Sequence, residues 1–141
     1  MSAALIAALF FTVALLVTTA YFIMGSLPLL ILKHDTPVDS GFVRRFFNTY
    51  YLAAMFTAGA TSVSYAFAAR PIFAAGAAAL ALLAAILRRK VIPKMDPLRA
   101  QIHVTGTDAI PGFRRIHVTA IVVNLVQLVL IVWNLMSLSL K

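Results

Sequence analysis

The last apolar segment of the chain, residues 113–138, carries an imidazole and three carboxamide side chains. They are His117, Asn124, Gln127 and Asn134. At about 100° per residue, these side chains fall within about a third of the circumference of a helix. A polar group without a hydrogen bond costs several kcal/mol in hydrocarbon, so a helix surrounded by lipid has no use for such a stripe. We therefore expect the stripe to face other helices.

Two side chains of this stripe have both a chemical and a structural interpretation. His117 lies about one turn inside the segment, where an ionisable group could move protons or bind a metal ion. It could instead form a hydrogen bond across helices, to Asn48 or Tyr51. Asn124 lies two turns further along the same face. Its structural interpretation is an interhelical hydrogen bond, which contributes about 0.6 kcal/mol on average.

A chemical site would require the stripe to meet the start of the second apolar segment. Arg44, Asn48 and Tyr51 share one helical face there, and Arg114 begins the last segment. Converging side chains would line a pocket open to the cytoplasm. Small residues on the same face, such as Ala58, would otherwise make it a packing surface. The candidate catalytic residues are His117, Asn124, Arg114, Arg44 and Tyr51.

The composition gives no support for metal, phosphate or thiol chemistry. The chain has no Cys and no Glu, and no two His residues have the spacing of metal ligands on one helix. We therefore expect no metal site, and no residue pattern identifies a cofactor. Since none of the Asp residues lies in an apolar segment, a carboxylate-based proton or sodium pathway is also disfavoured.

The elements that would position these residues are membrane helices. Of the 141 residues, 62% are hydrophobic and 11% charged, whereas a soluble domain is about half apolar and a quarter charged. The sequence therefore predicts one all-α membrane domain over residues 1–141, a bundle of four transmembrane helices. The first helix is expected to be uncleaved rather than a signal peptide. The expected spans are residues 3–24, 42–68, 71–88 and 113–138.

The expected helix ends follow from turn-forming residues. Pro28 should end or kink the first helix. Asp39 or Ser40 is a plausible N-cap for the second helix. Residues 88–112 form the longest polar segment, and their prolines make a long helix there doubtful.

The basic residues predict the orientation in the membrane. Ten of the twelve Lys and Arg lie within residues 33–45 and 88–115. The positive-inside rule then places both connections in the cytoplasm and both termini on the non-cytoplasmic side. This accounts for the net charge of +8 without nucleic acid, and the basic rim suits anionic lipid head groups.

Several short motifs resemble those of a known membrane family. The final span begins Phe113-Arg114-Arg115-Ile116-His117 and continues with Asn124-Leu125. Arg45-Phe46-Phe47 and Tyr50-Tyr51 begin the second span, and a basic stretch around Pro93 precedes the last. Together these resemble a four-helix membrane family of unknown function that includes bacterial proteins and transmembrane protein 205. The resemblance maps His117 and Asn124 onto motif positions but implies no activity. We expect a protein of the bacterial inner membrane.

A weaker resemblance concerns the anthrone-oxygenase-like four-helix proteins, which also place Arg and His at the start of the final span. Their Trp in that region is absent here. The single Trp of this chain, Trp133, lies near the other end of the span, where it suits an interface anchor.

Three functions follow from these observations. The favoured one is an accessory or structural subunit that packs against a membrane-protein partner or a second copy, because the third span is nearly all Ala and Leu. The alternatives are an oxygenase-like membrane enzyme for a hydrophobic substrate and a carrier for a small solute. Enzyme and carrier require His117 and Asn124 to converge with Arg44, Asn48 or Tyr51. A subunit predicts an exposed apolar groove without such a cavity.

Overall fold

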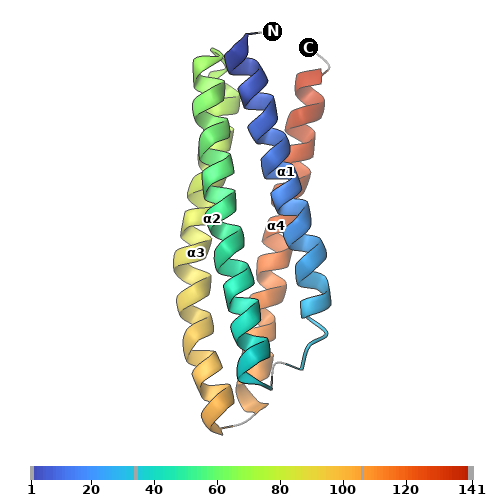
Figure 1. Cartoon of the computed structure of the whole chain (residues 1–141), viewed down its shortest axis with the longest axis vertical. Coiled ribbons are helices and arrows are strands. Elements are labelled where there is room, and N and C mark those ends of the chain that lie inside the picture. Colours follow the sequence, from blue (N-terminus) through green and yellow to red (C-terminus); the bar gives the residue numbers. More distant parts are fainter. Residues whose placement is uncertain (1, 34, 106, 140–141) are drawn as a thin grey trace.

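The computed structural model describes residues 2–33, 35–105 and 107–139, and all regular structure within them is helical. The elements in chain order are α1 (Ala3–Leu29), α2 (Pro37–Phe67), α3 (Pro71–Thr105), the short 3-10 helix η1 (Thr107–Ala109) and α4 (Ile110–Ser139). The four long helices run up and down one axis (Figure 1). The start of α1 and the end of α4 lie at the same end of the bundle as the α2–α3 turn, and the other two connections lie at the opposite end.

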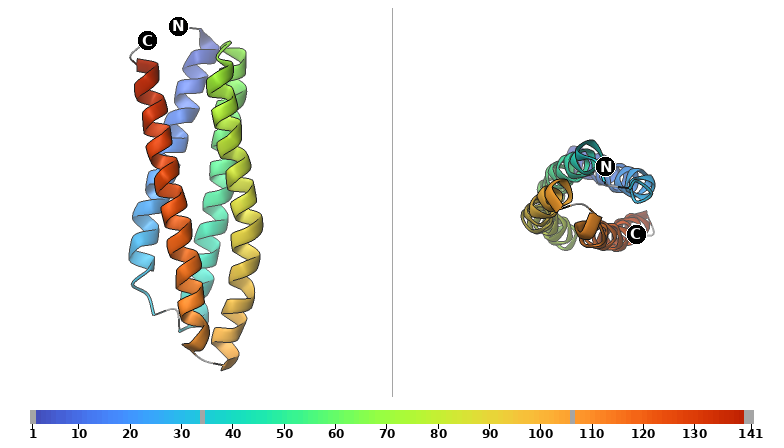
Figure 2. Two further views of the ribbon diagram at one scale, coloured as in Figure 1. Left: turned by 180° about the vertical axis from the view of Figure 1, so that it is seen from behind. Right: turned by 90° about the horizontal axis from the view of Figure 1, so that it is seen from below.

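The helices form a ring in which α2 packs against α1 and α3, while α4 packs against the same two helices. An end-on view shows α2 and α4 on opposite sides of this ring (Figure 2). Side chains that join α2 to α4 must therefore cross the middle of the bundle.

α1 extends beyond the predicted end of its span at residue 24 but ends next to Pro28, as the proline predicts. The helix passes through Pro28 and ends at Leu29, and its N-cap is Ser2, whose side chain accepts a hydrogen bond from the backbone N–H of Leu5. A proline removes one helical hydrogen bond. Pro28 lacks the N–H that would donate to the carbonyl of Met24, so the last turn loses this bond and the helix ends one residue later.

The predicted N-cap of α2 is wrong. Thr36 caps the helix, with its hydroxyl accepting a hydrogen bond from the N–H of Asp39 at 3.2 Å. Pro37 occupies the first helical position, where its fixed φ fits and its missing N–H has no partner to lose. Asp39 and Ser40 therefore lie inside the first turn.

α3 is the largest departure from expectation, because it runs without a break to Thr105, well beyond the predicted end near residue 88. Pro93 and Pro97 lie four residues apart on its exposed face. The opposite face buries apolar side chains, including Met95 and Ile102, in the core. Tertiary packing thus outweighs the hydrogen bonds that the two prolines remove.

α4 also begins earlier than predicted, at Ile110 rather than residue 113. Pro111 and Gly112 belong to residues 88–112, the polar segment in which the prolines make a long helix doubtful. They lie instead in its first turn, where a proline costs no backbone hydrogen bond.

The core is aromatic near the α1–α2 connection and small near the bundle centre. Phe22, Phe47 and Phe113 are fully buried, and their cluster continues to Ala54 and Ala58 of α2. Small residues let neighbouring membrane helices approach closely. Side chains that contribute to this cluster come from all four long helices, so the bundle has one main core.

Three of the helices, α1, α3 and α4, are long and apolar enough to cross a membrane. α2 has 31 residues but is not among them, and it contains hydroxyl-bearing side chains that are buried inside the bundle: Tyr50, Tyr51, Thr61 and Tyr65. These features are consistent with an integral membrane protein.

Candidate functional site

The polar stripe of α4 faces the bundle interior, as its periodicity predicts. His117, Asn124 and Gln127 are at most 2% exposed. Asn134, at the end of the stripe, is half-buried. The prediction that the stripe faces other helices is confirmed for the three buried members.

Asn124 is fixed by two hydrogen bonds at the centre of the bundle. Its Oδ1 accepts a hydrogen bond from the hydroxyl of Tyr50 on α2, and its Nδ2 donates to the carbonyl of Ala120 at 2.7 Å. The carboxamide therefore joins two helices that lie diagonally across the ring. The sequence alone did not predict this role of Tyr50, because the partner depends on the register between α2 and α4.

Tyr51 is fully buried beside Tyr50, with ring centroids 5.3 Å apart. Its hydroxyl lies near Asn124 without a hydrogen bond of good geometry. Tyr51 and Asn124 are thus neighbours, as a convergent site requires.

His117 lies in an aromatic setting. Its imidazole is fully buried, edge-to-face with the ring of Phe47 at a centroid distance of 4.9 Å. Asn48, one of its expected partners, instead accepts a hydrogen bond from Arg88 Nε at 3.0 Å. The side chain of α2 that contacts the imidazole ring, Phe47, is therefore apolar.

Arg44 does not join this group. Its guanidinium forms a two-pronged ion pair with Asp96 on α3, with Nε donating to Oδ1 and Nη2 to Oδ2 at 3.0 Å. Arg99 Nη1 lies 3.7 Å from the same carboxylate. Asp96 lies beyond the apolar part of α3. The hydrogen bond from Arg44 lowers the pKa of Asp96 below its usual value, and the nearby positive charges act in the same direction.

Arg114 is also separate. It is exposed at the start of α4 and donates to the carbonyl of Leu32 at 3.2 Å. It lines a shallow cavity with Lys33 and Asp35 at the end of the bundle.

The candidate residues thus fall into three places. Tyr51, Asn124 and His117 are inside, Arg44 lies between α2 and α3, and Arg114 lies on the α1–α2 connection.

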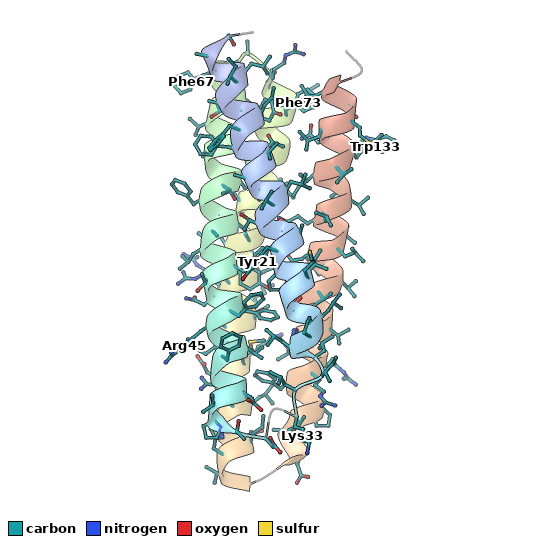
Figure 3. All side chains as sticks on the ribbon, turned by 45° about the vertical axis from the view of Figure 1, so that its right-hand side comes forward. Tyr21, Lys33, Arg45, Phe67, Phe73 and Trp133 are labelled. Carbon is teal, nitrogen blue, oxygen red and sulfur yellow. The ribbon has the colours of Figure 1, made fainter. Side chains whose placement is uncertain are left out.

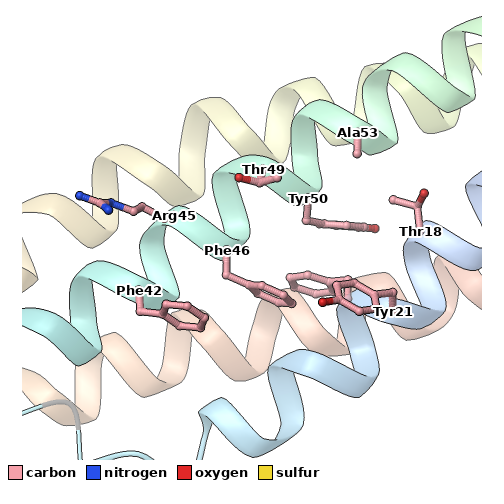
Figure 4. A pocket seen from close by; sticks show the side chains of 9 residues that line it. Thr18, Tyr21, Phe42, Arg45, Phe46, Thr49, Tyr50 and Ala53 are labelled. Atoms are coloured by element: carbon pink, nitrogen blue, oxygen red, sulfur yellow. The ribbon is translucent and has the colours of Figure 1, made fainter.

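Sequence reasoning missed a pair of adjoining cavities beside α2. One, of about 450 Å³, lies between α1 and α2 and is lined by aromatic side chains, two threonines and Arg45 (Figure 4). The other, of about 510 Å³, lies at the start of α2 and is lined by Arg44, Arg45 and Arg99. Both include Phe42 and Arg45 in their walls. The Arg44-Arg45 pair followed by Phe46-Phe47 was the sequence signal available for these cavities. The groove itself depends on the register of α1 against α2, which the sequence alone does not show.

Within residues 2–33, 35–105 and 107–139, no three His or Asp side chains lie close enough together to hold a metal ion. His34 lies outside these residues. Comparisons of the chain with protein-family models, curated proteins and solved structures found no match. The resemblances to the transmembrane protein 205 family and to the anthrone-oxygenase-like proteins therefore stay predictions, carried by the motifs alone.

Proposed function

We propose that this protein is a four-span membrane protein that acts as an accessory or structural subunit of a larger membrane assembly. Support for the fourth span comes from α2, which runs alongside the other three helices (Figure 1). The charge distribution supports an orientation with both termini on the non-cytoplasmic side of a bacterial inner membrane. Figure 3 shows Arg45 and Lys33 toward one end of the bundle and Trp133 toward the other, where it projects outward.

One observation carries the subunit role: the polar side chains form links between helices. Tyr50 and Asn124 join α2 to α4, and Arg44 and Asp96 join α2 to α3. Arg88 and Asn48 add a second link between α3 and α2. Polar side chains that are paired between helices hold the helices in one register, because a shift of either helix would leave these groups without hydrogen-bond partners. A rigid bundle of this kind suits a protein that works by association.

The outer surface supports the same role. α4 exposes a continuous set of large apolar side chains along its length. They are Val118, Val122, Leu125, Val126, Val129, Leu130, Val132, Trp133 and Met136. Such a face suits lipid or another membrane helix, and contacts in the membrane arise from close packing rather than from hydrophobic burial.

The test is the mass of the particle extracted from native membranes in a mild detergent, with absorbance and metal content measured on the same sample. A subunit is expected to co-purify in a fixed ratio with a larger complex. A small homogeneous particle would contradict the subunit role and favour an enzyme or carrier. Bound metal or pigment in that particle would favour the oxygenase-like enzyme.

A carrier is the second candidate, because of Gln127. Both polar atoms of its carboxamide are buried and make no hydrogen bond to a described residue. Gln127 lies one turn from Asn124 on the same face of α4, so the two could offer successive polar contacts to a small uncharged solute. Uptake of solutes into vesicles containing the purified protein would distinguish this role.

A further inference from the structure

The two cavities beside α2 differ in chemistry but share a wall. The cavity between α1 and α2 is apolar, and the cavity at the start of α2 is basic. Phe42 and Arg45 line both. A molecule that occupies both cavities must therefore have an apolar part and an anionic part joined at this point.

The apolar cavity has the dimensions of a lipid chain site. Tyr21 and Phe22 of α1 face Phe46 of α2, with ring centroids 6.3 and 5.6 Å from it. Figure 4 shows the labelled side chains along the groove, from Phe42 at one end to Ala53 at the other. These two residues are eleven positions apart on α2, which is about 16 Å at the rise of a helix. That length is about half of the ~30 Å hydrocarbon core of a bilayer, or one leaflet.

The basic cavity has an excess of positive charge. Arg44, Arg45 and Arg99 line it, and Asp96 offsets the charge of one of them. Arg45 is exposed, and Arg99 is half-buried, with its Nη1 3.7 Å from the carboxylate of Asp96. Guanidinium groups offer planar paired donors that match the oxygens of a phosphate. The cavity therefore has both charge and donors available for an anion.

We propose that the two cavities together bind one anionic phospholipid of the membrane. Its head-group phosphate lies on Arg45 and Arg99, and an acyl chain lies in the groove between α1 and α2. Charge complementarity selects this occupant, because an apolar helix would leave the arginines without a counter-charge and the head group of a zwitterionic lipid would add a positive charge beside them. The proposal rests on the proposed membrane crossing, and the proposed orientation places the lipid in the cytoplasmic leaflet.

The test is binding of phosphatidylglycerol and phosphatidylcholine to the purified protein in detergent, measured by native mass spectrometry. The wild-type protein is expected to prefer phosphatidylglycerol. Arg45→Gln should weaken phosphatidylglycerol binding about fivefold, the effect of one cation near an anionic lipid surface. Arg89→Gln, which removes the same charge from an exposed site outside both cavities, should leave binding unchanged.

A second pair of variants tests the apolar cavity between α1 and α2. Ala53→Phe fills the end of the groove and should reduce binding of phosphatidylglycerol, whereas Ala75→Phe on the exposed face of α3 should not.

Equal loss of binding in Arg45→Gln and Arg89→Gln would show that only surface charge matters and would overturn the proposal. Unchanged binding in Arg45→Gln or Ala53→Phe would also overturn it, as would competition by inorganic phosphate. These outcomes would contradict the lipid site but not the proposed subunit role. Extraction as a small particle would contradict the subunit role but not the lipid site.

Discussion

The buried carboxamides of α4 show how differently two similar residues can be used. Asn124 has hydrogen-bond partners on its own helix and on α2, whereas Gln127, one turn away, makes no hydrogen bond to a described residue. A buried polar group without a partner costs about 1–3 kcal/mol. Gln127 is thus either a cost to stability or a contact for a molecule that enters the bundle.

Replacing Gln127 by Leu separates these possibilities. If the carboxamide has no ligand, Gln127→Leu should raise the free energy of unfolding by about 1 kcal/mol, because the unsatisfied group is removed. Thermal unfolding in detergent measures the change. Asn134→Leu, at a half-buried position of the same stripe, should give a smaller gain. A loss of stability in Gln127→Leu would indicate a bound solute and favour the carrier.

The Arg44–Asp96 ion pair predicts a pH dependence. The pKa of Asp96 is lower in the folded protein than in the unfolded chain, so the unfolded state binds the proton more readily. The stability from this pair is therefore fully present above the usual carboxyl pKa of about 4, and is lost as the pH falls through the lowered value. Melting temperatures measured between about pH 6 and about pH 3 should show this loss.

The matched variants for this measurement are Asp96→Asn and Asp108→Asn. Asp96→Asn should remove most of the acid-induced loss, and Asp108→Asn, at an exposed position, should keep it. Identical pH profiles for wild type and Asp96→Asn would mean that the ion pair contributes nothing measurable, as many exposed pairs do.

The sequence predicted which residues of α4 are buried but not what they contact. The burial of His117, Asn124 and Gln127 follows from their spacing on one helix. Their partners follow from the registers between helices, which no local pattern encodes. For the same reason Arg44 could be placed on the face of Tyr51, while its actual partner, Asp96, lay in a segment expected to be a loop.

At the scale of the elements, proline position decides how far each helix extends. Pro37 and Pro111 lie in first turns, where the missing N–H costs no helical hydrogen bond, whereas Pro28 lies in the last turn of α1, which ends one residue later. Pro93 and Pro97 lie inside α3, and packing of its opposite face maintains the helix. The apolar segments predicted the four long helices and their order, whereas tertiary contacts set the helix ends, above all that of α3.

Close packing of α1 on α2 predicts the effect of a single methyl group. A Cβ added at Gly25 would meet the ring of Phe46 at 2.7 Å, whereas one added at Gly59 meets nothing within 4 Å. Gly25→Ala should therefore destabilise the protein by about 1–3 kcal/mol relative to Gly59→Ala. Gly59→Ala alone should be neutral or slightly stabilising, since Ala is the better helix former. Equal melting temperatures for the two variants would show that the Phe46 ring moves aside freely.

At the scale of the whole molecule, the positive charge gathers at one end of the bundle, because ten of the twelve Lys and Arg lie within residues 33–45 and 88–115. The same end holds the α1–α2 and α3–α4 connections. The proposed orientation follows from this asymmetry through the positive-inside rule. It also requires α2 to cross the membrane despite its more polar composition.

The absence of Cys from the chain makes this orientation directly testable. Single cysteines introduced at Ala3, Arg70 and His103 should fall into two groups by their reactivity with a membrane-impermeant maleimide. Ala3→Cys and Arg70→Cys should react in intact cells, and His103→Cys only after permeabilisation. Reaction at Ala3 and His103 from the same side would contradict the four-span arrangement, and reaction at Arg70 only after permeabilisation would show that α2 does not cross.

The most direct test of whether the polar side chains hold the helices together is a double-mutant cycle on Tyr50 and Asn124. Tyr50→Phe, Asn124→Leu and the double variant are compared by their free energies of unfolding in detergent. A structural link predicts that each single variant is destabilised and that the two are coupled by about 0.6 kcal/mol or more. A coupling of zero would contradict the assignment of this pair as an interhelical link and return Asn124 to the candidates for a chemical site.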